Sequence, residues 1–149
     1  MLKPEIKTQL KNFFHSTSQL KQNEIIRSSN YTGDIAEYLC KEIYELDLCK
    51  SQREECYDAT KNDLLYQIKI NNSSQKTNQI IGNPNKYDFL LLLITAESKL
   101  FNPIYNEYFM AIYRINSDEL KNKSSFAKNW IDTLTPEYLV TNNFDIIKN

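Results

Sequence analysis

The feature that most constrains the fold is a run in the middle of the chain in which two sets of side chains alternate. The first set, at every second position, is apolar: Leu64, Tyr66, Ile68 and Ile70. The intervening set holds the polar groups together with one leucine: Leu65, Gln67, Lys69 and Asn71. A period of two residues is typical of a β-strand, so this division predicts a strand with one buried face.

A polar turn precedes this run and predicts a β-hairpin. A two-residue turn at 61–62 or at 62–63 places Asp58 on the same face as Gln67 and Lys69, within direct or diagonal reach. A three-residue turn reverses the parity and sends Asp58 to the other face. Two of the three registers therefore bring a carboxylate, an amide and an ammonium group together.

These three groups have the chemistry of a metal-assisted hydrolase. Oxygen ligands from a carboxylate and an amide or main-chain carbonyl suit Mg²⁺, which keeps several of its waters. A nearby lysine can orient or deprotonate a water, or neutralise a phosphate, so the set suits phosphodiester hydrolysis. The alternative is a solvated strand face with Asp58 introducing the turn, and spacing alone favours that alternative.

A helix is expected over residues 32–46. Its apolar stripe consists of Ile35, Leu39, Ile43 and Leu46. Glu37 lies at the border of this stripe, a position from which a carboxylate can lean over the rim of a sheet toward a metal. The alternative is that Glu37 pairs with Lys41 one helical turn later.

Asp58 followed by Gln67-Ile68-Lys69 resembles the core motif of the PD-(D/E)xK nuclease superfamily, in a Q-x-K form similar to that of Mrr-like restriction enzymes. Upstream, residues 33–39 (GDIAEYL) resemble the G-x-x-x-E-x-x-L/A helix that supplies a further glutamate in many of these nucleases. The chain departs from the commonest pattern at Gln67, where an amide replaces the second acid. The resemblance covers residues 32–95, under half of the chain, and it extends to small single-domain proteins with a similar helix and hairpin.

The resemblance implies a metal-dependent endonuclease that hydrolyses DNA phosphodiester bonds in a restriction or other defence system. The implied catalytic residues are Glu37, Asp58, Gln67 and Lys69. The implied ligands of Mg²⁺ or Mn²⁺ are Glu37, Asp58 and the main-chain carbonyl of Ile68, while Lys69 positions the attacking water. The expected partners are DNA and a second copy in a homodimer, with a protein of the defence system as a further candidate. Two alternatives stay open: a non-catalytic interaction protein with a degenerate nuclease fold, and a small inhibitor or immunity-type protein.

Composition removes several other classes of protein. With two glycines, Gly33 and Gly82, the chain has no glycine-rich phosphate loop or dinucleotide fingerprint. One histidine, His15, and three cysteines without zinc spacing argue against zinc hydrolases and histidine-based triads. A net charge of −1 argues against a protein that coats DNA nonspecifically.

The same composition predicts a cytoplasmic protein that does not enter a membrane. Its free thiols favour a reducing compartment. The charged N-terminus lacks the apolar core of a signal peptide. The apolar run from residue 89 to residue 95 is too short to cross a bilayer.

A chain of 149 residues predicts one domain, residues 1–149. Its expected parts are a helical extension (1–30), an αβ core (32–116) and a C-terminal segment (117–149). The expected fold is α/β, with a mixed central sheet of about four or five strands flanked by helices. The resemblance implies that this fold is restriction-endonuclease-like. The expected elements are one long or two short helices at 3–28, a helix at 32–46, a hairpin at 56–71, strands at 87–95 and 108–115, polar connections at 47–55 and 71–86, and a short helix from residue 117.

Overall fold

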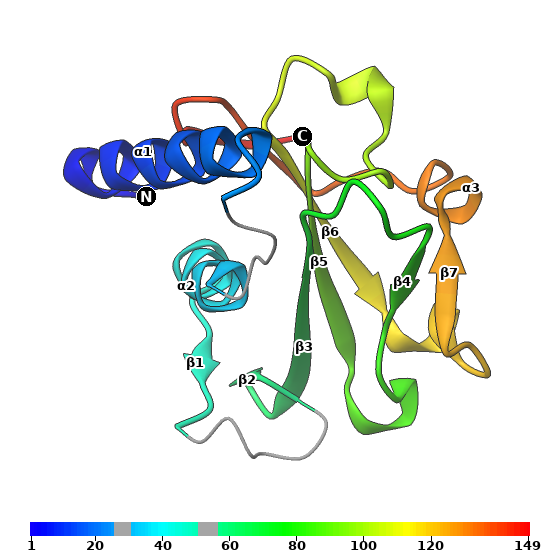
Figure 1. Cartoon of the computed structure of the whole chain (residues 1–149). Coiled ribbons are helices and arrows are strands. Elements are labelled where there is room, and N and C mark those ends of the chain that lie inside the picture. The colour runs from blue at the N-terminus through cyan, green and yellow to red at the C-terminus, as the bar shows by residue number, and fades with distance from the viewer. Residues whose placement is uncertain (26–30, 51–56) are drawn as a thin grey trace.

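The computed structural model describes residues 1–25, 31–50 and 57–149, and in these ranges it is a mixed α/β structure (Figure 1). Its main sheet contains β1 (Asp47–Leu48), β2 (Ala59–Lys61), β3 (Leu64–Asn71), β5 (Phe89–Thr95), β6 (Met110–Asn116), β8 (Tyr138–Val140) and β9 (Ile146–Lys148). The strands lie side by side in that order. The pair β3 and β5 is parallel, and every other neighbouring pair is antiparallel.

The remaining elements form a layer on each face of this sheet. The helices are α1 (Pro4–Gln22), α2 (Thr32–Tyr44) and the short α3 (Lys128–Ile131). A separate two-stranded sheet pairs β4 (Asn78–Ile80) with β7 (Ser125–Ala127). Short 3₁₀ helices occupy Pro84–Lys86, Pro103–Tyr105 and Ser117–Leu120. α1 and α2 lie on one side of the main sheet, while β4, β7 and α3 lie on the other (Figure 1).

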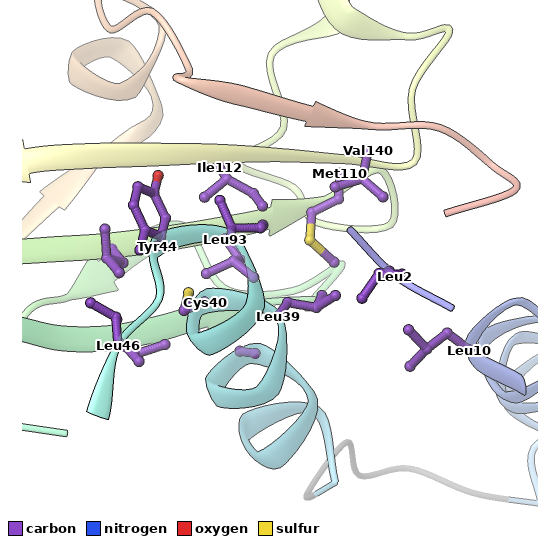
Figure 2. Packing of buried hydrophobic residues seen from close by; sticks show 14 of the residues in the cluster. Leu2, Leu10, Leu39, Cys40, Tyr44, Leu46, Leu93, Met110, Ile112 and Val140 are labelled. Carbon is purple, nitrogen blue, oxygen red and sulfur yellow. The ribbon is translucent and has the colours of Figure 1, made fainter. Parts of the chain in front are cut away.

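Strand β5 is the centre of the protein because both of its faces are covered. Its residues from Leu90 to Ile94 have 0% relative exposure. Leu91 and Leu93 belong to the core beneath α1 and α2, where Figure 2 shows Leu39 and Cys40 of α2 over the sheet. The alternate residues of β5 belong to a second core beneath β4, β7 and α3. The continuous apolar run in the sequence thus becomes a strand buried on both faces, as expected.

The N-terminal helix packs on the body of the protein. Pro4 stands in the first turn of α1, where its missing N–H leaves no hydrogen bond unmade. Phe14 is buried, and its ring lies 4.9 Å from that of Phe109 and 5.6 Å from that of Phe144, centroid to centroid. Lys7 adds an ion pair to Asp145 near the C-terminus. The predicted helix over 3–28 is confirmed as far as Gln22, and residues 26–30 lie outside the described residues.

The mixed α/β class and its central mixed sheet are confirmed, but the expected strand number was too low. β1 and β4 fall in the two segments that were predicted as polar connections, 47–55 and 71–86. β7, β8 and β9 fall in the C-terminal segment, for which strands were not predicted. Each of these strands has two or three residues, too few to display a period, and each is defined by its pairing with a neighbour. The part of the 47–55 loop from residue 51 lies outside the described residues.

A search of the described residues finds no helix with the length and apolarity needed to span a membrane.

Candidate functional site

The hairpin that begins the site adopts one of the registers expected from the sequence. Its turn is Asn62-Asp63, with φ angles of 50° and 66°. Ala59 therefore pairs with Tyr66, and Lys61 pairs with Leu64. Two left-handed residues are the mark of a tight hairpin turn whose twist matches the strands, and Asn and Asp tolerate that conformation better than most residues.

Asp58 lies immediately before β2 and acts as an extension of that strand. Its backbone N–H donates to the carbonyl of Tyr66 over 2.8 Å. Its Oδ2 accepts two hydrogen bonds of 2.7 Å, one from Nε2 of Gln67 and one from the N–H of Ile68. The carboxylate thus takes the place of a strand partner for Ile68. The carbonyl of Ile68 is directed to the same edge, because the N–H and C=O of a strand residue point the same way.

Gln67 and Lys69 lie on the sheet face opposite to α2. In the parallel pairing they stand beside Leu90 and Leu92 of β5, which belong to the core on the β4 side. Gln67 is 9% exposed and Lys69 is half-buried. No ion pair joins Lys69 to any residue in the described ranges.

The alternation of the strand is confirmed, but the expectation of one buried face is wrong. Asn71, on the polar face, is 5% exposed. Its Nδ2 donates to Oε1 of Gln79, 3.1 Å away, and Gln79 belongs to β4. Asn71, at the end of this polar face, is therefore covered by β4, which belongs to a second layer that the sequence did not reveal.

Glu37 approaches Asp58 from α2, on the other side of the sheet. Burial raises the pKa of its half-buried carboxyl, and the nearby charges of Asp58 and Asp34 raise this pKa further. Burial, followed by the charges of Glu37 and Asp58, also raises the pKa of the Cys40 thiol one helical turn later. Both effects place Glu37 and Asp58 within electrostatic reach of each other. The alternative pairing of Glu37 with Lys41 is not found among the described ion pairs.

Asp58, Gln67 and the backbone of Ile68 therefore meet at an edge of the sheet, and the predicted residues do not all converge on one face. Hydrogen bonds join Asp58 to Gln67 and Ile68. Glu37 is linked to Asp58 by charge. Lys69 shares a strand face with Gln67, two positions along, but no ion pair in the described ranges joins it to Asp58. The edge arrangement arises because Glu37 and Gln67 come from opposite sides of β3.

This set of groups fits a hard divalent cation. Neither Glu37 nor Asp58 has a basic ion-pair partner among the described residues, so no side-chain cation of these ranges pairs with either of the two neighbouring carboxylates. Hydrogen bonds in the described ranges reach Oδ2 of Asp58 and leave Oδ1 unused. A search of those ranges for three or more grouped His, Cys, Asp or Glu side chains finds none that could hold a metal. Two carboxylates, a main-chain carbonyl and waters are, however, a sufficient oxygen set for Mg²⁺.

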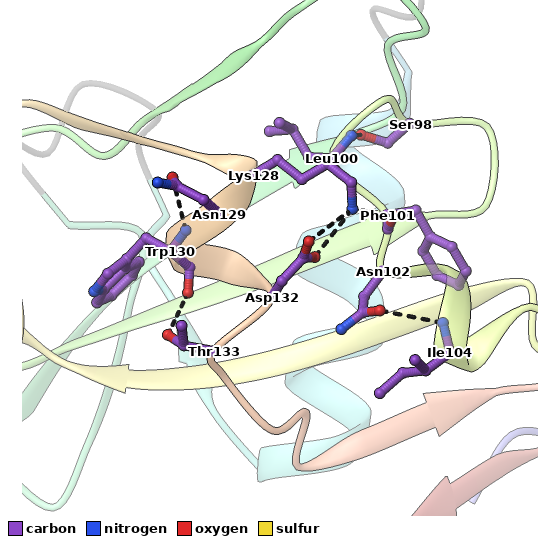
Figure 3. Close-up of polar contacts among 10 residues, drawn as sticks. All are labelled: Ser98, Leu100, Phe101, Asn102, Ile104, Lys128, Asn129, Trp130, Asp132 and Thr133. Atoms are coloured by element: carbon purple, nitrogen blue, oxygen red, sulfur yellow. Dashed lines mark hydrogen bonds and ion pairs between the residues drawn. The ribbon is translucent and has the colours of Figure 1, made fainter.

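A second polar cluster, which sequence reasoning missed, joins α3 to the loop after β5 (Figure 3). Nζ of Lys128 donates to the carbonyl of Phe101 over 2.9 Å and pairs with Asp132 at 3.0 Å. In the same loop, Oδ1 of Asn102 accepts from the N–H of Ile104. The i,i+4 spacing of Lys128 and Asp132 is the sequence feature that could have predicted their ion pair. Because these polar groups form hydrogen bonds and an ion pair with one another, we assign the cluster a structural role.

No family model matches the chain, and no curated protein matches it.

Proposed function

We propose that the protein is a metal-dependent endonuclease with a restriction-endonuclease-like fold, which hydrolyses phosphodiester bonds of DNA. The observation that carries the proposal is the position of Asp58. Its carboxylate accepts hydrogen bonds from Gln67 and from the backbone of Ile68 at the strand edge. Glu37 is close enough for the charge of Asp58 to raise the pKa of its carboxyl. This arrangement agrees with the order of the nuclease motif, in which a helical glutamate precedes an acid and a Q-x-K strand.

The residues would divide the work as follows. Asp58, Glu37 and the carbonyl of Ile68 would hold Mg²⁺ or Mn²⁺. The bound ion would stabilise charge on the phosphate oxygens and lower the pKa of a water. Lys69 would orient the attacking water and offset negative charge, as its position beyond Gln67 on β3 allows. The oxygen of the attacking water would form a bond to phosphorus and give up a proton to solvent water, while the bond from phosphorus to the leaving sugar oxygen would break and that oxygen would take up a proton from solvent water.

Plasmid nicking tests the proposal. Purified protein with Mg²⁺ should convert supercoiled DNA to open circles, and EDTA should stop the reaction. Asp58→Ala should lose both metal binding and nicking, whereas Lys69→Ala should bind metal and fail to cleave. Exposed residues supply matched controls, Glu107→Ala for the acid and Lys99→Ala for the lysine. Equal nicking by wild type and Asp58→Ala would contradict the proposal.

We carry three further expectations as proposals: a homodimer, a partner in a defence system and a cytoplasmic location. The apolar surplus of residues 2–26 was the expected dimer contact, but Leu10 and Phe14 pack on the protein's own core. The exposed large apolar side chains left on the described part of this segment are those of Leu20 and Ile25. Light scattering that gives a mass of 17.6 kDa at high concentration would count against the dimer.

A further inference from the structure

Gln67 occupies the position at which the nuclease pattern has its second acid. It is hydrogen-bonded to Asp58, which occupies the position of the first acid. Its Nε2 and the N–H of Ile68 donate to the same oxygen of Asp58, each over 2.7 Å. A carboxylate can only accept hydrogen bonds, so the amino end of the Gln67 amide faces Asp58. A donor N–H carries partial positive charge and cannot serve as a ligand to a cation.

Asp58 needs such support because of its place in the chain. It precedes β2, which begins at Ala59, and its half-buried side chain can rotate about two bonds. Two N–H donors on Oδ2 fix both rotations and leave Oδ1 as the atom that can reach a cation. Gln67 is itself held in place, since it lies in the interior of β3 and is 9% exposed.

The competing role for Gln67 is direct ligation through Oε1, in the manner of the acid it replaces. The two roles require different atoms at position 67. Orientation of Asp58 requires an N–H donor, whereas ligation of a cation requires an oxygen. Side chains of similar length can supply one of these without the other.

We propose that Gln67 is a positioning residue, which orients Asp58 so that Oδ1 binds the cation and which contributes no ligand of its own. This inference rests on the proposed metal site and assigns a different role to the residue that departs from the nuclease pattern. Its consequence is that restoring an acid at position 67 places a carboxylate against the carboxylate of Asp58.

Three substitutions separate the roles. At pH 8 the imidazole of Gln67→His is neutral and can donate an N–H at about the reach of the Gln67 amide, but it has no oxygen for Mg²⁺. Gln67→Glu keeps an oxygen and loses the donor. Gln67→Met is of similar length and has neither. Gln75→His, at an exposed position, is the control for the substitution itself.

Calorimetric titration with Mg²⁺ and melting in EDTA are the measurements. A positioning role predicts that Gln67→His binds Mg²⁺ within about threefold of wild type, while Gln67→Met loses about tenfold, as the loss of one charge-assisted hydrogen bond would give. In EDTA, Gln67→Glu should melt lowest, because like charges then face each other. Loss of Mg²⁺ affinity in Gln67→His equal to that in Gln67→Met, with both proteins folded, overturns the inference.

The wild-type protein gives a second measurement that needs no substitution. In NMR spectra, the side-chain amino group of Gln67 should stay protected from solvent exchange both in EDTA and with Mg²⁺ bound. Release of that group on addition of Mg²⁺ would overturn the positioning role while leaving the proposed function intact. A wild-type protein that binds neither Mg²⁺ nor Mn²⁺ overturns the proposed function and this inference together.

Discussion

Glu37 connects the stability of the protein to the candidate metal site. Burial and the charge of Asp58 raise the pKa of its carboxyl above the ordinary value of 4.5. Between that value and the raised pKa, the folded state binds more protons than the unfolded chain. Stability therefore falls as pH rises through this interval, and the metal-free protein remains less stable at neutral pH.

Glu37→Gln should remove this penalty. We expect the variant to melt about 1–3 °C above wild type at pH 7 in EDTA, since the electrostatic term of a partly exposed group stays below about 1 kcal/mol. The difference should vanish below pH 4, where the wild-type carboxyl is also protonated. Saturating Mg²⁺ should then raise the melting temperature of wild type more than that of the variant. Scanning calorimetry, with Glu107→Gln as the exposed control, measures both effects, and a variant less stable than wild type at pH 7 would contradict them.

Two buried tyrosines offer a matched test of hydrogen bonding in the second core. The hydroxyl of Tyr113 is buried and has no hydrogen-bond partner in the described part of the chain, whereas that of Tyr87 donates to the carbonyl of Ile81 over 2.8 Å. We expect Tyr113→Phe to stabilise the protein by about 1 kcal/mol, because it removes an unsatisfied polar group. Tyr87→Phe should destabilise it by a similar amount. Urea unfolding measures both, and equal destabilisation by the two would show that the Tyr113 hydroxyl is hydrogen-bonded.

At the scale of elements, the sequence predicted the helices and strands whose hydrophobic pattern extends over several residues. The alternation of β3, the continuous apolar run of β5 and the stripe of α2 each extend over several residues. β1, β8 and β9 are too short to carry such a signal. These strands form because they pair with backbone N–H and C=O groups of a neighbouring strand. Their own side chains carry no pattern that predicts this pairing.

In the candidate site, too, the features set by local sequence were predictable and those set by tertiary packing were not. The pairing of Asp58 with Gln67 depends on turn length, a local property, so the sequence could narrow it to a few registers. The approach of Glu37 from the opposite side of the sheet depends on how α2 packs, which is a tertiary property. The donor role of Gln67 depends on which end of an amide faces a carboxylate. A motif match gives only the residue type at position 67, so it cannot say which end of the amide faces Asp58.

At the scale of the whole molecule, two cores on the two faces of one sheet separate the support of the fold from the candidate site. α1 closes the first core at the end of the sheet where Phe109 and Phe144 lie, and its contacts reach the C-terminal strands through Asp145. The site is built from α2, β2 and β3. Loosening α1 should therefore weaken the fold without removing any residue of the site.

Phe14→Ala tests this separation. The buried ring of Phe14 packs against those of Phe109 and Phe144, which also contact each other, so its removal should destabilise the protein by about 3 kcal/mol through lost burial and an incompletely filled cavity. Phe13→Ala is the control. Because Phe13 is only partly buried, this substitution should lower the stability of the protein by less than Phe14→Ala does. Limited proteolysis should cut the Phe14 variant earlier within residues 1–25. With Mg²⁺, the variant should still show the rise in melting temperature expected of wild type, since Glu37 and Asp58 keep their supports. A folded Phe14 variant that no longer responds to Mg²⁺, beside a wild type that does, would mean that α1 belongs to the site.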